Sequence, residues 1–319
     1  MKDGFVKVAA ATPEIRVADC NYNADKIIEM ITEAERKQVD LLVFPELCVT
    51  GYTAGDLFYA DTLLDGAKAA LTKIAEATNG IKTLIFVGLP VKCDGKVYNC
   101  AAAISDGDII ALIPKKNLPN YNEFYEKRWF EPAGKISRDV EIGGRTVRME
   151  EGALFAAEGF REFTVGVELC EDLWVADSPS IALAKKGANI IVNLSASDET
   201  VGKAEYRRSL VSMQSAKLVS GYVYADAGDG ESTTDLVFSG HNIIAENGKI
   251  LKESNLFENG MIISEIDVKF LDYERRKLYP GAAEEPGVAF AFFLEERETE
   301  LTRKIDSMPF VRSEEHTSE

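Results

Sequence analysis

The chain has 319 residues, and because 46% of them are hydrophobic it can bury the core of one large α/β domain or of two modest ones. Its formal net charge of −17 argues against a surface of clustered Lys and Arg, so we expect no nucleic-acid partner and no anionic membrane partner. Its five cysteines lack CxxC spacing, which predicts neither a disulfide framework nor a metal site and favours a reducing cytoplasm.

The first residues, MKDGFVKVAAATPE, carry an Asp at position 3 and contain no continuous apolar segment, so they predict no export signal. No stretch approaches the length needed to cross a bilayer, and we expect no membrane span. From residue 5 onward, β-rich runs alternate with helical patterns: FVKVAAAT, NADKIIEMITEAERKQV, DLLVFPE, LLDGAKAALTKIAEATNG and TLIFVGLPV. This alternation is typical of α/β proteins.

Two local patterns give detailed expectations. Residues 23–39 carry an apolar stripe at helical spacing, with Asn23 as the predicted N-cap. Residues 96–116 form two extended runs joined by Ser-Asp-Gly-Asp. Because Asp106-Gly107 suits the positive φ angles of a tight turn, this segment predicts a β-hairpin.

The second half of the chain repeats the element order of the first. The order is again strand, helix, strand, helix, strand and hairpin, in the segments FTVGVELCED, SPSIALAKKG, ANIIVNLSAS, YRRSLVSMQSAKLVSG, YVYADAG and DLVFSGHNIIAENGKIL. Strands such as LLVF and NIIVN are apolar at consecutive positions, as expected when both faces of a sheet are covered. Two such halves packed sheet to sheet predict a single-domain, four-layer α-β-β-α sandwich.

Three predicted strand ends carry reactive groups: Glu46 after Phe-Pro, Lys115 after Leu-Ile-Pro, and Cys170 after Val-Glu-Leu. In α/β folds, functional sites are built at strand ends. Each residue also has an ordinary structural explanation: a solvated loop carboxylate, a surface lysine and a packed core thiol, respectively.

A cysteine nucleophile needs a base, because a free thiol with a pKa near 8.5 is only slightly ionised at neutral pH. The chain has two histidines, His241 in the extended run VFSGHNII and His316 in a polar tail. A cysteine–histidine pair would have to use His241, which could equally be a core residue. A carboxylate base assisted by a lysine is the other option.

The segments FPELCVTGY, PKKNLP and GVELCEDLW resemble, in order and rough spacing, the Glu, Lys and Cys motifs of the nitrilase, or carbon-nitrogen hydrolase, superfamily. Within this superfamily, the chain is most similar to the glutaminase domain of bacterial glutamine-dependent NAD synthetases. The segments that carry this similarity are GYTAGDLF, LPNYNEFYEKRWF, CEDLWVADSPS and NLSASDETVGKAEYRR. The resemblance extends from residue 5 to residue 311 and implies a nitrilase-like α/β sandwich.

The resemblance also implies residue roles in hydrolysis of the side-chain amide of L-glutamine through a cysteine thioester. Glu46 would be the general base, Lys115 the electrostatic stabiliser and Cys170 the nucleophile, with Glu126 as a supporting residue that orients the lysine. Three further residues would hold the α-amino and carboxylate groups of glutamine: Tyr121, Glu171 and Ser197. The glutaminase reaction would need no cofactor and no metal.

On this basis we expect a hydrolase domain at residues 1–275 and an extension at 276–311 that leads toward a synthetase domain. The Ser-Gly-Gly-x-Asp-Ser phosphate loop of that synthetase does not occur in the sequence, so ATP and magnesium would belong to a missing domain that accepts the ammonia. Residues 312–319, RSEEHTSE, read as a translated sequencing adapter, and we expect them to be foreign to the natural protein.

Two other functions fit the same residues. The chain could be a stand-alone amidase of the superfamily that acts on another ω-amide or on a carbamoyl amine, or it could be a dormant subunit that needs a partner. The resemblance further implies a homo-oligomer, a dimer or a larger assembly, formed through this domain.

Overall fold

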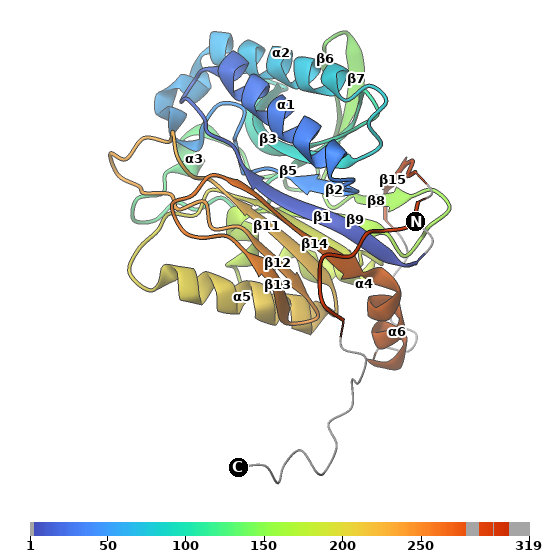
Figure 1. The fold of residues 1–319 in the computed structure, drawn as a ribbon. Helices are drawn as coiled ribbons and strands as arrows, with labels where there is room; N and C mark the ends of the chain where they lie inside the picture. The colour runs from blue at the N-terminus through green and yellow to red at the C-terminus, as the bar shows by residue number, and fades with distance from the viewer. Residues whose placement is uncertain (1–2, 279–286, 296, 306–319) are drawn as a thin grey trace, which may run out of the picture.

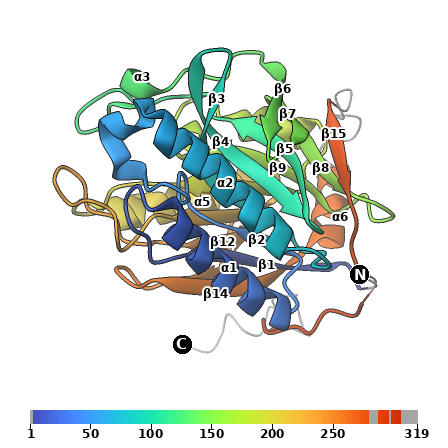
Figure 2. The same ribbon diagram turned by 90° about the horizontal axis from the view of Figure 1, so that it is seen from above.

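The computed structural model describes residues 3–278, 287–295 and 297–305. The segment 312–319, with His316, lies outside the described residues. Two β-sheets pack face to face, with helices on the outer face of each (Figure 1). The view from above shows the helices α1 (Cys20–Arg36) and α2 (Asp61–Ala77) lying side by side over the first sheet (Figure 2). The predicted nitrilase-like α-β-β-α sandwich is therefore confirmed.

The first sheet has the strand order β14-β1-β2-β3-β4-β5-β7-β6. Strands β1, β2 and β3 run parallel, and the remaining neighbours are antiparallel except for the parallel contact between β5 and β7. Its strands are β1 (Phe5–Thr12), β2 (Leu41–Val43), β3 (Leu84–Cys93), β4 (Lys96–Ser105), β5 (Asp108–Pro114), β6 (Ser137–Ile142), β7 (Arg145–Glu150) and β14 (Gly260–Asp267).

The second sheet has the order β13-β12-β11-β10-β9-β8-β15, with β9, β10 and β11 parallel in its centre. Its strands are β8 (Leu154–Ala157), β9 (Thr164–Leu169), β10 (Ile190–Ser195), β11 (Gly221–Asp226), β12 (Ile243–Glu246), β13 (Lys249–Glu253) and β15 (Ala289–Phe292). The three central strands are buried at every position, because the other sheet covers one face and helices cover the other.

Three apolar cores separate the four layers. One lies between the first sheet and α1 and α2, and another lies between the two sheets. The third lies between the second sheet and the helices α4 (Pro179–Lys185) and α5 (Lys203–Leu218). The remaining helical segments are η1 (Tyr52–Tyr59), α3 (Glu126–Trp129), η2 (Cys170–Leu173) and α6 (Val268–Leu278).

The predicted hairpin is confirmed, since Asp106 and Gly107 join β4 to β5 with φ angles of 52° and 81°. The predicted N-cap of the first helix is wrong. Helix α1 begins at Cys20, and the Asp19 side chain accepts the N–H of Tyr22. Asn23 is buried inside the first turn, where its side chain accepts the N–H of Arg16, so it fixes the incoming loop instead.

The described part of the C-terminal segment packs against both sheets. The expected boundary at residue 275 falls inside α6, and β15 pairs parallel with β8 at the edge of the second sheet. Beyond it, Arg297 pairs with Asp40, and Arg303 forms two hydrogen bonds with Glu246, a buried residue of β12. These contacts link the segment to both halves of the sandwich.

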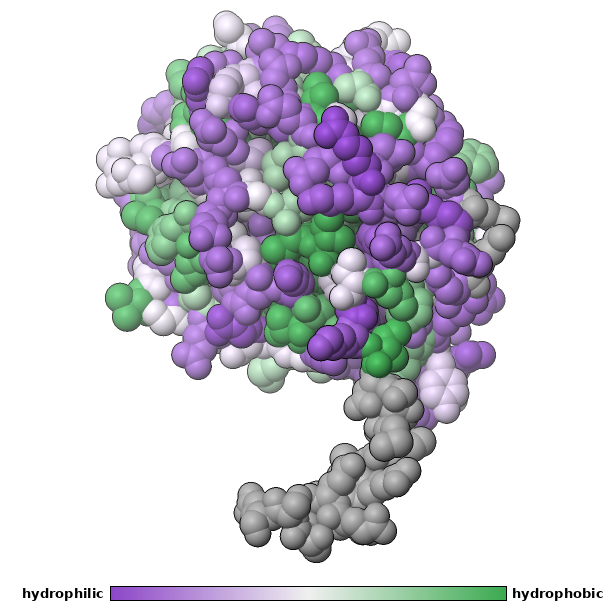
Figure 3. Space-filling view, viewed as in Figure 1, coloured by the Kyte–Doolittle hydropathy of each residue, from purple (hydrophilic) through white to green (hydrophobic). Residues whose placement is uncertain are grey.

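Hydrophilic residues cover most of the face seen in Figure 3, and apolar residues occur there in small groups. Within the described ranges, no helix is both long and apolar enough to cross a membrane.

Candidate active site

The three reactive strand ends meet where the two sheets face each other. Glu46 lies three residues beyond β2, Lys115 directly follows β5, and Cys170 directly follows β9. The N–H of Glu46 donates to Ser195 O on β10, at 3.2 Å, and so ties the loop after β2 to the opposite sheet. Glu46 and Lys115 both act electrostatically on the Cys170 thiol. The site is therefore shared between the two sheets.

Lys115 lies between two carboxylates in a buried cluster. Its Nζ donates to Glu46 Oε1 at 2.6 Å and to Glu126 Oε1 at 2.7 Å, and all three side chains are at most 1% exposed. Asn99 Nδ2 donates to Glu46 Oε1 at 2.7 Å, and Tyr52 Oη donates to Glu126 Oε1 at 2.9 Å. Each charged group is thus hydrogen-bonded, as burial requires.

Burial and mutual charge set the protonation of this cluster. Burial alone would lower the pKa of Lys115, but the charges of Glu126 and Glu46 outweigh it and hold the pKa well above its usual value. Burial raises the pKa of Glu126 to about 7. Burial, followed by the charge of Glu46, also raises the pKa of the Cys170 thiol well above its usual value. The Cys170 thiol is therefore neutral at rest, and it would need a base to react as a nucleophile.

A base of the right kind is present. Glu46 Oε2 is buried and has no hydrogen-bond partner among the described residues, whereas Oε1 accepts from Lys115 and Asn99. An unpaired buried carboxylate oxygen is costly and therefore requires an explanation, and Glu126 Oε2 is unpaired in the same way. Glu46 can accept a proton through Oε2 while Lys115 keeps its position on Oε1.

Cys170 lies on a strained turn between β9 and η2. Its φ of 40° falls in the left-handed region, which is unfavourable for a residue with a Cβ. The N–H of Cys170 donates to Asn193 Oδ1 at 3.1 Å, and the N–H of Leu169 donates to Asp172 Oδ2 at 3.0 Å. Backbone strain of this kind clusters at active sites, ligand clamps and switch regions, so it marks Cys170 as a candidate functional residue.

The thiol faces a pocket of about 560 Å³. Glu171, Tyr121 and Ser197 line it, and Tyr121 Oη donates to Glu171 Oε2 at 2.9 Å. Lys203, which the sequence analysis did not select, lies in the same wall. The other lining residues are Pro119, Asn122, Glu123, Phe124, Trp174, Asp198, Thr200, Val201, Gly202 and Tyr206. The structure therefore brings all seven predicted site residues to the pocket or to the buried cluster.

Comparisons with known proteins agree with this geometry. The sequence model of the family described as carbon-nitrogen hydrolase matches residues 7–273. The chain belongs to this family. Its members include enzymes that hydrolyse amide bonds, and the chain is an amidohydrolase.

The curated relatives are longer than this chain. The glutamine-dependent NAD(+) synthetase of Mycobacterium tuberculosis is 38% identical over 277 residues, which cover 86% of this chain and 41% of that protein. The enzyme of the same name from Thermotoga maritima is 32% identical over 299 residues, which cover 90% of this chain and 48% of that protein. The chain thus spans less than half the length of these relatives.

Solved structures show the same fold. The glutamine-dependent NAD(+) synthetase from Cytophaga hutchinsonii has a TM-score of 0.73 at 27% identity, over 85% of this chain and 45% of that one. An amidase from a Nesterenkonia species has a TM-score of 0.65 over 88% of this chain and 97% of that one. At 20% identity the amidase is evidence for the fold only.

Among the described residues, which include His241 but not His316, the alternative cysteine–histidine pair is not formed. His241 is buried away from the pocket, and its two ring nitrogens contact Arg207 Nη1 at 2.9 Å and Glu253 Oε1 at 2.6 Å. Burial lowers the pKa of His241. Since both nitrogens are engaged elsewhere, His241 is a structural residue.

Sequence reasoning missed several residues that position the site of the hydrolase. Asn99 and Asn193 are polar residues within otherwise buried strands, and this was the available sequence signal for them. Asp172 was visible as the second acid after the cysteine. Tyr52 gave no signal, because its hydrogen bond to Glu126 spans 74 positions of the chain.

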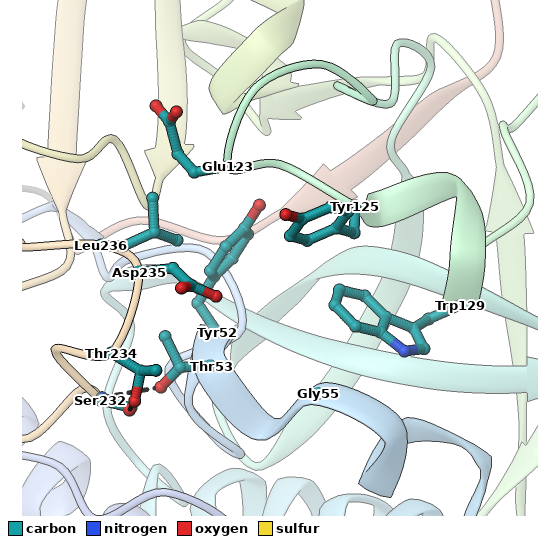
Figure 4. A pocket seen from close by; sticks show the side chains of 10 residues that line it. All are labelled: Tyr52, Thr53, Gly55, Glu123, Tyr125, Trp129, Ser232, Thr234, Asp235 and Leu236. Carbon is teal, nitrogen blue, oxygen red and sulfur yellow. Dashed lines mark hydrogen bonds between the residues drawn. The ribbon is translucent and has the colours of Figure 1, made fainter.

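A second hollow, of about 270 Å³, lies on the other side of Tyr52. Figure 4 shows the Tyr52 ring between Leu236 and Tyr125, with Trp129 beyond. Glu231, in the loop before Leu236, accepts the N–H groups of Tyr52 and Thr53 and so anchors the start of η1. The loop 231–236 therefore holds the backbone of Tyr52, whose hydroxyl donates to Glu126 in the buried cluster.

Proposed function

We propose that this chain hydrolyses the side-chain amide of L-glutamine to glutamate and ammonia, as the ammonia-supplying half of glutamine-dependent NAD synthesis. The main support is one observation. A thiol on a strained turn faces a pocket next to a buried Glu46–Lys115 pair. The names of the relatives, which are more than 30% identical to the chain, supply glutamine as the amide donor.

The first half of the reaction forms a thioester. Glu46 Oε2 takes the thiol proton as Cys170 Sγ attacks the amide carbon. Lys115 Nζ and the backbone N–H of Glu171 stabilise the negative charge that develops on the amide oxygen. The carbon–nitrogen bond then breaks, and Glu46 returns its proton to the leaving nitrogen, which departs as ammonia.

The second half removes the acyl group. Glu46 takes a proton from a water molecule whose oxygen attacks the thioester carbon. The carbon–sulfur bond breaks, the thiolate regains the proton from Glu46, and glutamate leaves. These steps use only side chains and backbone groups of this chain. ATP and magnesium belong, in this proposal, to the synthetase domain that consumes the ammonia.

The charges around the pocket suit a free α-amino acid. Glu171, held by Tyr121, offers a carboxylate to an α-ammonium group. Among the described lining residues, Lys203 carries the single positive charge and, with Ser197, can receive an α-carboxylate. Opposite charges on one wall favour a zwitterion over an uncharged amide. A simple aliphatic amide would offer no charge to either group, and Lys203 would keep only its ion pair with Asp198.

The test is to incubate the purified chain with L-glutamine and to measure glutamate and ammonia together. We expect equal amounts of both products, and none from Cys170→Ala, with a much lower rate on asparagine. Acetamide and an N-carbamoyl amine test the alternative amidase function. Faster turnover of either compound than of glutamine, or turnover by Cys170→Ala, would contradict the proposal. Homo-oligomerisation and a cytoplasmic location stay predictions.

A further inference from the structure

Asp172 is a buried carboxylate next to the nucleophile that the proposed mechanism does not use. It is 2% exposed and lies two residues after Cys170. Its Oδ2 accepts the N–H of Leu169 at 3.0 Å. Its Oδ1 accepts both the backbone N–H and the side-chain Nδ2 of Asn117, each at 2.8 Å. One side chain therefore binds three donors, one from its own turn and two from a segment 55 positions earlier in the chain.

These two segments carry opposite sides of the site. Leu169 immediately precedes the strained Cys170, and Asn117 follows Lys115 by two residues. Asn117 also begins the loop that contains Tyr121 in the pocket wall. The same loop carries Pro119, whose carbonyl accepts the N–H of Glu126 at 3.1 Å. Asp172 thus joins the nucleophile turn to the segment that holds the lysine and its partner.

The chemistry of the contact requires a carboxylate. All three partners of Asp172 are N–H donors, so each of its oxygens must act only as an acceptor. An asparagine at this position would direct an NH₂ group at one set of these donors. Burial is the main reason why the pKa of Asp172 is raised to about 6, and it outweighs the lowering by the N–H of Leu169 and by the charge of Lys115. At neutral pH the group is mainly ionised.

We propose that Asp172 is a positioning residue that holds the Cys170 turn and the loop after Lys115 at one separation, so that the thiol faces the substrate amide. This inference rests on the proposed function, because it assumes that Cys170 is the nucleophile. Asp172 does not line the pocket, so it acts through the residues that it holds.

The first test compares Asp172→Asn with Asp40→Asn. Asp40 is a matched control, because it is also a buried aspartate that accepts a backbone N–H, from Lys7, and burial also raises its pKa. A displacement of about 1 Å at a reacting centre costs about 100-fold in rate. We expect Asp172→Asn to lower kcat for glutamine by about that factor with KM changed less than about threefold, and Asp40→Asn to keep the wild-type kcat.

The second readout separates positioning from loss of folded protein. The rate constant for alkylation of Cys170 by iodoacetamide depends on the thiol's surroundings, whereas a misfolded fraction changes only the amplitude. We expect this rate constant to fall about 10-fold in Asp172→Asn. Cys170→Ala supplies the blank for the other four cysteines.

A milder variant guards against failure to fold. Asn117→Ala removes one of the three donors and leaves the carboxylate in place, so we expect kcat and the alkylation rate constant to fall about fivefold. The inference would be overturned if a folded Asp172→Asn variant, or Asn117→Ala, kept the wild-type kcat and the wild-type alkylation rate constant. The glutaminase function would stand in that case. If the wild type releases no glutamate but the alkylation rate constants differ as expected, the proposed function fails and the positioning role stands.

Discussion

The loop of Glu46 packs directly against Gly88 on β3, and Gly88→Ala tests how exact the position of Glu46 must be. A Cβ at Gly88 would lie 2.3 Å from Leu47 N, 2.6 Å from Pro45 O and 2.8 Å from the Glu46 carbonyl carbon. All three are backbone atoms, so no side chain can rotate away.

The size of the effect follows from these distances. Ordinary van der Waals contact begins at 3.4 Å, so the loop must retreat by about 1 Å. The loop is held at Glu46 N by Ser195 O and at Val49 N by Gly88 O, and these bonds resist that movement. We expect kcat for glutamine to fall about 100-fold and the free energy of unfolding to fall by about 1–3 kcal/mol.

The control is Gly66→Ala in α2. A Cβ there would lie 3.5 Å from Cys20 Sγ, which is ordinary contact. Replacing a helical glycine by alanine stabilises by up to about 1 kcal/mol, so kcat should not change and the unfolding midpoint should rise. The assay is coupled glutamate release, with unfolding followed by circular dichroism. A Gly88→Ala enzyme with kcat within about twofold of the wild type would refute the argument.

Three other predictions concern the buried cluster and the C-terminal segment. Because burial raises the pKa of Glu126 to about 7, kcat should fall as the pH drops below about 7, and Glu126→Gln should lower kcat at every pH and abolish that limb. Because the pKa of Glu126 in the folded state lies above the ordinary 4.5, protonation of Glu126 stabilises the fold as the pH falls from about 7 to 4.5. Circular dichroism should therefore show a folded protein at the pH values where activity is lost. Tyr52→Phe removes a hydrogen bond that lowers the pKa of Glu126, so a pH–rate profile should show the acid limb at higher pH; an unshifted limb would contradict this. Arg303→Ala leaves the buried Glu246 without its guanidinium partner, and denaturant unfolding should show a loss of about 2 kcal/mol, against less than about 0.5 kcal/mol for Arg138→Ala, whose ion pair is exposed.

The sequence predicted the layers and the meeting of the strand ends, because both follow from local patterns. Runs that are apolar at every position indicate strands covered on both faces, and carboxyl ends of parallel strands share one edge of a sheet. The Asp106-Gly107 turn was predictable because two consecutive positive φ angles need such residues.

The supporting contacts could not be predicted in this way. Asn193 lies in a strand with both faces buried, so its position in the sequence does not show that its amide reaches Cys170. Strand β15 pairs with β8, which lies far earlier in the chain, and no local pattern records such a pairing. Periodicity also misplaced the start of α1, since Asp19 and Asn23 are both good caps and only the packing of the preceding loop decides between them.

The division of the site between the sheets means that neither half of the chain holds a complete set of reacting groups. Glu46, Lys115 and Glu126 precede the turn at residues 151–152, and Cys170 follows it. Strand β14, from the second half, pairs along the whole of β1. Two fragments cut at that turn would each be inert toward amides, yet would share an extended surface for reassembly. The molecule is thus suited to a complementation assay, in which ammonia release reports that two fused partners have met.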